Sequence, residues 1–244
     1  MQKGTILFFL FICLMVLMPA GYIAVIGDPQ ERSYPPGTTV VIGDSITRGY
    51  SNGVNETSYS AYLSELLPGT TIINAGFWEQ ETSQMLQRFQ DDVLNQNPRY
   101  VIIQGGRNDI FFGTPVETTE MNLKSMYQMA EQNDIIPIAT TLYFDNSFNV
   151  SQNQQIGELN AWIVNYSVEN DNPVVDFNGP FRDPSNPGQS LPSLLLPDQI
   201  HPSEAGYREM ANDIFNQIFA RNATPRKTEY HARDGIRTQE LLRD

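Results

Sequence analysis

Two residue types that build metal and disulfide sites are nearly missing from this chain of 244 residues. The single cysteine, Cys13, excludes an internal disulfide framework, a cysteine-rich zinc site and a cysteine redox pair. The only histidines are His201 and His231, so a metal site made of several imidazoles is not expected. These two scarcities favour chemistry that side chains perform without a bound metal ion.

Basic residues are also scarce, with 15 Lys and Arg against 28 Asp and Glu and a formal net charge of −13. A chain this acidic lacks the general basic surface that holds nucleic acid, so no nucleic-acid partner is expected. Apolar residues make up 40% and aromatic residues 11% of the chain, which is enough to bury a core. The length fits one large domain or two small ones.

The N-terminus has the pattern of a targeting segment. Lys3 is followed by an uncharged, mostly apolar run from Ile6 to Ile26. A short positive region before such a run is typical of a secretory signal, and an uncleaved run of about 20 residues also spans a bilayer. We therefore expect residues 1–26 to be a signal peptide or an N-terminal membrane anchor, with the bulk of the chain outside the cytoplasm. Four Asn-x-Ser/Thr sequons agree with export: Asn55, Asn149, Asn165 and Asn222.

The rest of the chain divides by composition into three parts. Residues 27–38 are a linker that contains Pro35, Pro36 and Gly37. Residues 39–221 form the predicted domain. Residues 222–244 form a polar tail with few large apolar side chains, which we expect to be loosely attached. Leu241 and Leu242 could form a short terminal helix.

The domain alternates short β-branched runs with stretches of helical spacing. Apolar runs without alternation suit buried parallel strands, and apolar side chains at helical spacing suit helices packed on a core. The expected strands are Thr39–Ile42, Thr71–Ile73, Tyr100–Ile103, Ile135–Thr140 and Val174–Asp176. The expected helices are Tyr59–Leu67, Met85–Val93 with a cap at Thr82 or Ser83, Met121–Ala130, Ile156–Val168 and Ser203–Phe219. This order predicts an α/β fold, a doubly wound five-stranded parallel sheet in a flavodoxin-like three-layer α/β/α sandwich.

Polar residues follow three of these strands and precede the last helix. Gly-Asp-Ser ends at Ser45 after the first strand, Asn-Ala-Gly ends at Gly76 after the second, and Arg-Asn-Asp surrounds Asn108 after the third. Asp198-Gln-Ile-His201 comes just before the last helix. Ligands of open α/β sheets bind beyond the carboxyl ends of the strands, so these segments should meet at one edge.

Each segment alone is typical of a helix cap or a turn, but together they supply the parts of an acyl-transfer site. A hydroxyl nucleophile such as Ser45 needs a base, and His201 is the only histidine in the domain. Asp198, three residues earlier, can fix the tautomer of that histidine. A glycine N–H at Gly76 and the amide of Asn108 can stabilise an oxyanion.

The arrangement resembles the SGNH/GDSL hydrolase family over about residues 38–221, with four matching blocks in the family's order. One block departs slightly, because Gly-Asp-Ser is followed by Ile46 instead of leucine. The resemblance implies Ser45 as nucleophile and His201 as general base, oriented by Asp198. It also implies an oxyanion hole made by the N–H groups of Ser45 and Gly76 and the side chain of Asn108. No metal or organic cofactor is needed for this mechanism.

Four neighbours of these blocks have two interpretations each. Trp78, with Phe77, follows the oxyanion glycine and contacts substrate or simply packs on the protein. Arg107, with Arg48, meets an anionic group of the substrate or forms a salt bridge to a nearby acid.

Three functional hypotheses stay open on the sequence. The leading one is a secreted or membrane-tethered serine carboxylic ester hydrolase that acts on lipid acyl esters or other simple esters. Its late Asp-Gln-Ile-His-Pro segment, residues 198–202, is similar to the lysophospholipase-like branch. The second is an O-acetyl esterase or an acyltransferase on carbohydrate. The third is a non-catalytic carbohydrate-binding surface module.

Overall fold

A computed structural model describes residues 37–49, 57–220, 228–233 and 236–241. The expected signal or anchor, residues 1–26, lies outside the described residues, as do most of the linker and the sequons at Asn55 and Asn222. No helix among the described residues is both long and apolar enough to cross a membrane.

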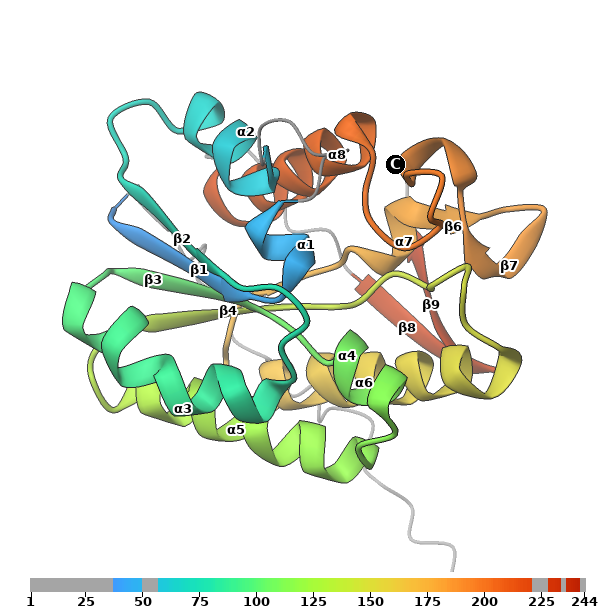
Figure 1. Ribbon diagram of the computed structural model, residues 1–244, viewed down its shortest axis with the longest axis horizontal. Helices are drawn as coiled ribbons and strands as arrows, with labels where there is room; N and C mark the ends of the chain where they lie inside the picture. Colours follow the sequence, from blue (N-terminus) through green and yellow to red (C-terminus); the bar gives the residue numbers. More distant parts are fainter. Residues whose placement is uncertain (1–36, 50–56, 221–227, 234–235, 242–244) are drawn as a thin grey trace, which may run out of the picture. The chain divides into compact units, whose positions relative to one another are not determined.

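A five-stranded parallel sheet forms the centre of the fold, as predicted (Figure 1). Its strands run in the spatial order β2-β1-β3-β4-β5. The register places Gly43 at the end of β1 beside Gly76 of β2 and Gln104 of β3. The segments that carry the polar motifs therefore leave the sheet at the same edge. The strands are β1 (Thr39–Gly43), β2 (Ile72–Gly76), β3 (Tyr100–Gln104), β4 (Ile136–Thr140) and β5 (Val174–Val175).

Helices cover both faces of this sheet, which makes the predicted three-layer sandwich (Figure 1). Successive side chains of a strand point to opposite faces. Val40 and Ile42 of β1 accordingly pack in one apolar cluster and Val41 in the other. The first cluster includes side chains of α3 (Thr82–Asp92), α5 (Val116–Glu131) and α6 (Val150–Glu169). The second includes side chains of α2 (Tyr59–Leu66) and α8 (Glu204–Ile214).

Several helix boundaries differ from the sequence prediction, since α5 begins at Val116 instead of Met121 and α6 begins at Val150 instead of Ile156. Helix α3 begins at Thr82, but its N-cap is Glu81, which forms a reciprocal capping box with Gln84. The expected cap at Thr82 or Ser83 is therefore wrong, because both residues already lie inside the helix. Helix α8 has Ser203 as its N-cap, as expected, and continues beyond Ile214 as a π-helical turn, Phe215–Phe219.

Several short elements were not expected from the sequence. The helices among them are α1 (Ser45–Arg48), α4 (Arg107–Phe112) and α7 (Asn178–Phe181), with 3-10 turns at Leu94–Gln96 and Pro192–Leu194. Strands β6 (Arg182–Asp183) and β7 (Asn186–Ser190) form a hairpin before the last helix. In the predicted tail, β8 (Thr228–Arg233) pairs with β9 (Ile236–Leu241). Leu241 is thus in a strand, and the short terminal helix suggested for it is wrong.

Candidate active site

A continuous chain of polar contacts joins the end of β1 to the loop before α8. Ser45 Oγ lies 2.9 Å from His201 Nε2. His201 Nδ1 lies 2.8 Å from Asp198 Oδ2. The structure thus brings together three predicted site residues that are up to 156 positions apart in the sequence.

Ser45 is held at the first position of α1 by the residues on either side of it. The carboxylate of Asp44 caps this helix, because its Oδ1 accepts the Ile46 N–H at 2.8 Å. At Gly43 a Cβ atom would collide with Thr47 Oγ1 and the carbonyl of Gln104. The turn that presents Ser45 therefore needs both the glycine and the aspartate of the Gly-Asp-Ser segment.

Asp44 is completely buried, which raises the pKa of its carboxyl group to about 7. Burial is the largest cause, since it disfavours the charged form. The hydrogen bond from Ile46 and the charge of Arg107 lower the pKa, whereas the charge of Asp109 raises it. Asp44 therefore braces the loop with a carboxyl group that is protonated far more readily than an exposed one.

The loop that carries His201 is organised around Asp198. Asp198 Oδ1 accepts the N–H groups of Ile200 at 2.9 Å and His201 at 3.0 Å. Between them Gln199 adopts a left-handed backbone with a φ of 63°. Tyr143, which lies beyond β4, donates its hydroxyl to the carbonyl of Ile200 at 2.8 Å. The ring of His201 is thus held by its own loop and by a neighbouring segment of the fold.

The pKa of Asp198 is lowered from its ordinary value. Partial burial alone would raise it, but the hydrogen bonds from Ile200 and from the ring and backbone of His201 outweigh that effect. The carboxylate therefore stays ionised beside the imidazole.

Gly76 sits where no side chain fits, because a Cβ atom there would overlap the backbone of Arg48 and Thr47. Its N–H donates to Asn74 Oδ1 at 2.9 Å. The amide nitrogen of Asn74 donates to the carbonyl of Thr47 at 2.8 Å and to the hydroxyl of Ser60 at 2.9 Å. Asn74 therefore joins the end of β2 to α1 and α2.

Asn108 is buried at the start of α4, and its neighbours fix its amide. Its Oδ1 accepts a hydrogen bond from Arg107 at 3.1 Å, and its Nδ2 donates to the carbonyl of Gln80 at 3.1 Å. The next residue, Asp109, accepts the N–H of Thr82 at 3.0 Å. These contacts orient the amide nitrogen of Asn108 toward the segment that follows β2.

The residues that were expected to contact substrate differ in their environments. The side chains of Trp78 and Phe77 are 39% and 45% exposed. The guanidinium carbon of Arg48 lies 5.6 Å from the ring centre of Trp78. Arg107 forms an ion pair with Asp145 at 2.7 Å, so its charge is used inside the protein, as the salt-bridge interpretation predicts.

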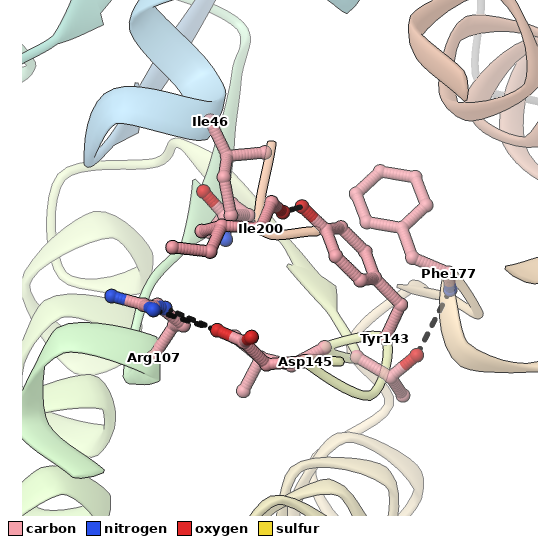
Figure 2. Close-up of a pocket in the computed structure, with 9 residues that line it drawn as sticks. Ile46, Arg107, Tyr143, Asp145, Phe177 and Ile200 are labelled. Carbon is pink, nitrogen blue, oxygen red and sulfur yellow. Dashed lines mark hydrogen bonds and ion pairs between the residues drawn. The ribbon is translucent and has the colours of Figure 1, made fainter. Parts of the chain in front are cut away.

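A small pocket lies between segments that carry the predicted site residues (Figure 2). Ile46, Arg107 and Ile200, which each adjoin one of those residues in the sequence, line it together with Tyr143 and Phe177. Its volume of about 10 Å³ is close to that needed by one water molecule. Figure 2 shows the ion pair of Arg107 at one side of this pocket and the Tyr143–Ile200 hydrogen bond at another.

Among the described residues, no group of three or more His, Cys, Asp and Glu side chains is placed to hold a metal ion. The polar groups at this edge are a hydroxyl, an imidazole, carboxylates and an amide. Such a set suits proton transfer and nucleophilic attack.

Residues 41–209 match the model of the GDSL-like Lipase/Acylhydrolase family. The chain belongs to this family. Among solved structures, a GDSL-family protein described as lipolytic, from Desulfitobacterium hafniense, is 34% identical with a TM-score of 0.63. The alignment covers 72% of this chain and 95% of that one. The GDSL family fold is therefore shared over nearly the whole of that protein.

Two curated proteins also resemble this GDSL family member. An acetylxylan esterase from Geobacillus stearothermophilus is 24% identical over 187 residues, which is 69% of this chain and 84% of that one. An N-acylneuraminate cytidylyltransferase from Streptococcus agalactiae is 25% identical over 128 residues. That match covers 52% of this chain but only 29% of the cytidylyltransferase. The family match places this protein among the GDSL-like acylhydrolases, and the acetylxylan esterase relative is consistent with ester hydrolysis.

Sequence reasoning missed three side chains that organise the site: Asn74, Arg88 and Tyr143. Asn74 begins the Asn-Ala-Gly motif, but the sequence does not show that its side chain accepts the Gly76 N–H. Arg88 and Tyr143 lie outside every motif and act through contacts with distant segments.

Proposed function

We propose that this protein is a serine carboxylic ester hydrolase in which Ser45 forms an acyl-enzyme. The observation that carries the proposal is the chain of contacts from Ser45 through His201 to Asp198. With its Nδ1–H donated to Asp198, the imidazole presents Nε2 as an acceptor to the serine hydroxyl. Ser45 Oγ attacks the ester carbonyl while His201 Nε2 takes its proton.

The oxyanion formed by this attack receives hydrogen bonds from the Ser45 N–H, the Gly76 N–H and Asn108 Nδ2. The amide nitrogen of Asn108 has two hydrogens, and one of them already serves Gln80. The Gly76 N–H donates to Asn74, so it serves an oxyanion by sharing its hydrogen. In other enzymes one such donor accelerates the reaction by roughly 10²–10³.

The second half of the reaction returns the enzyme to its starting state. His201 passes its proton to the leaving alcohol, which departs as the tetrahedral intermediate collapses. The same imidazole then takes a proton from water, which attacks the acyl-enzyme. As the second tetrahedral intermediate collapses, His201 returns that proton to Ser45 Oγ and the carboxylic acid leaves. No step needs a metal ion or an organic cofactor.

The direct test is ester turnover by Ser45→Ala. We expect hydrolysis of p-nitrophenyl acetate to fall to the background of buffer, with an unchanged circular dichroism spectrum. Turnover at the wild-type rate would reject Ser45 as nucleophile. No turnover by either protein, together with no labelling by a fluorophosphonate, would favour a non-catalytic carbohydrate-binding module.

Short acyl esters of carbohydrates are the substrate class that we propose. Trp78 and Phe77 expose flat aromatic surface directly after Gly76, and sugar rings stack on such surfaces. The acetylxylan esterase among the relatives agrees with this class.

Lipid acyl esters are the second candidate. Phe111 and Phe112, on the helix that carries Asn108, are also exposed and offer an apolar surface to an acyl chain. A series of p-nitrophenyl esters from acetate to palmitate, with acetylated xylo-oligosaccharides beside it, separates the two classes. Highest kcat/KM on acetyl esters supports the first, and a rise toward palmitate supports the second. Products formed with an alcohol acceptor would reveal acyl transfer.

We also propose that the protein acts outside the cytoplasm, on the strength of the run Ile6–Ile26. Expression with the native N-terminus should give extracytoplasmic protein. Recovery only with detergent would select a membrane anchor over a cleaved signal, and soluble cytoplasmic protein with Met1 intact would reject export.

A further inference from the structure

We propose that Arg88 is a positioning residue of the oxyanion hole, an inference that rests on the proposed esterase function. Arg88 lies on α3, outside every motif of the site. One guanidinium nitrogen, Nη1, donates to the carbonyl of Ala75 at 2.7 Å. Another, Nη2, donates to the carbonyl of Gly43 at 3.0 Å. A single side chain therefore holds the ends of both strands that lead to Ser45 and Gly76.

The contact with Ala75 acts on an oxyanion donor through one peptide bond. The carbonyl of Ala75 and the N–H of Gly76 belong to the same planar amide. A cation that binds the oxygen fixes the plane of that amide and draws electron density from its nitrogen, which strengthens the N–H as a donor. Arg88 thus orients and polarises the Gly76 N–H without touching the substrate.

The contact with Gly43 fixes the neighbouring segment in the same way. The carbonyl of Gly43 also accepts the N–H of Phe77 at 3.0 Å, so β1 and the residue after Gly76 share one acceptor. The guanidinium carbon of Arg88 lies 4.6 Å from the ring centre of Phe77. The guanidinium therefore adds to the β1–β2 ladder in holding the Ser45 turn beside the Gly76 turn.

The third donor is connected to Arg88 through Gln80. Arg88 Nε donates to Gln80 Oε1 at 2.6 Å, and the backbone carbonyl of Gln80 accepts Asn108 Nδ2 at 3.1 Å. All three segments that supply oxyanion donors are thus linked to the same side chain.

The chemistry of the contacts requires a guanidinium. Arg88 uses three nitrogens in three directions, and it also pairs with Asp92 at 2.6 Å while 15% of its side chain is exposed. A lysine ammonium is a point charge that cannot reproduce this planar fork. A merely structural role would lower stability, whereas a role in the oxyanion hole lowers kcat in protein that is folded.

The experiment compares Arg88→Met, Arg88→Lys and the control Arg208→Met in the full chain. Arg208 is a surface arginine on α8 that pairs with Glu204, 3.0 Å away, and lies over Tyr62. For each protein, kcat per mole of folded protein and KM are measured with p-nitrophenyl acetate. The thermal unfolding midpoint of each protein is also measured. We expect both Arg88 variants to lose at least about tenfold in kcat with KM changed less than about threefold. Arg208→Met should keep the wild-type kcat.

Each other outcome has a definite meaning. A folded Arg88→Met with a kcat within threefold of wild type overturns the inference. Should Arg88→Met fail to fold, Arg88→Lys decides, and a wild-type kcat in that variant overturns it. Hydrolysis by Ser45→Ala at the wild-type rate would instead remove the proposed function itself, and the role of Arg88 with it.

Discussion

Asp198 holds His201 at two points. Its Oδ2 lies 2.8 Å from the ring Nδ1, and its Oδ1 accepts the backbone N–H of His201 at 3.0 Å. The same carboxylate therefore sets the tautomer of the ring and the turn that carries it. Both functions depend on a three-residue spacing that leaves room for the left-handed Gln199 between them.

Replacing this carboxylate with an amide separates the two functions. Asp198→Asn keeps an oxygen for the backbone N–H groups but can place an amide N–H against ring Nδ1, which favours the wrong tautomer. We expect kcat to fall by at least about tenfold with KM changed much less. Asp183→Asn is the matched control, since Asp183 Oδ1 makes the same kind of turn with the Ser185 N–H, 2.8 Å away, outside the triad. Equal kcat values for the two variants would contradict the role given to Asp198.

The pH dependence of the reaction should have one limb from histidine. Only neutral imidazole accepts the Ser45 proton, so kcat/KM should rise with pH. The lowered pKa of Asp198 keeps its carboxylate ionised beside the ring, so Asp198 adds no second limb. His201→Ala should remove the limb and nearly all activity. A variant that kept both the rate and the profile would show that another group is the base.

The buried carboxyl group of Asp44 should make the stability of the folded protein depend on pH. Its pKa is about 7 in the folded protein, against an ordinary value of 3.8, so the folded state binds a proton more readily than the unfolded chain does. The buried carboxyl group of Asp44 contributes fully to the free energy of unfolding below about pH 4. This contribution falls by up to about 4 kcal/mol as the pH rises through 7. Asp44→Asn keeps an oxygen for the Ile46 N–H and does not titrate. Urea unfolding from pH 4 to 8 should therefore show a flatter curve for the variant, and parallel curves would refute the buried-acid account.

Trp78 tests the substrate class. If sugar rings stack on its exposed face, Trp78→Ala should raise KM for acetylated xylo-oligosaccharides by about three- to tenfold. The KM for p-nitrophenyl acetate should change little, because that ester has no sugar. Phe112→Ala is the control, as it removes an exposed ring that lies four residues beyond Asn108 instead of directly after an oxyanion donor. An equal rise for both esters would argue against a sugar subsite.

The sequence predicts the sheet and the meeting of the motifs for a simple physical reason. Buried parallel strands are short apolar runs, and their carboxyl ends share an edge, so Ser45, Gly76 and Asn108 were placed together by spacing alone. The elements that were missed are short or irregular. Helix α1 has only four residues, too few to display a helical period.

The supporting contacts were harder to predict because they join distant segments. Arg88 and Asp92 are four residues apart on α3 and pair at 2.6 Å, a spacing typical of a surface ion pair. Nothing local indicates that the same guanidinium reaches the carbonyls of Gly43 and Ala75. The capping box at Glu81 was missed because a glutamate is a less common N-cap than the threonine and serine that follow it.

The identity of the residue that a fluorophosphonate modifies tests the central claim most directly. The wild-type protein is treated with the probe and digested, and the modified peptide is sequenced by mass spectrometry. We expect a single adduct on Ser45, formed more slowly by His201→Ala and not at all by Ser45→Ala. An adduct on another serine, or full labelling of Ser45→Ala, would contradict it.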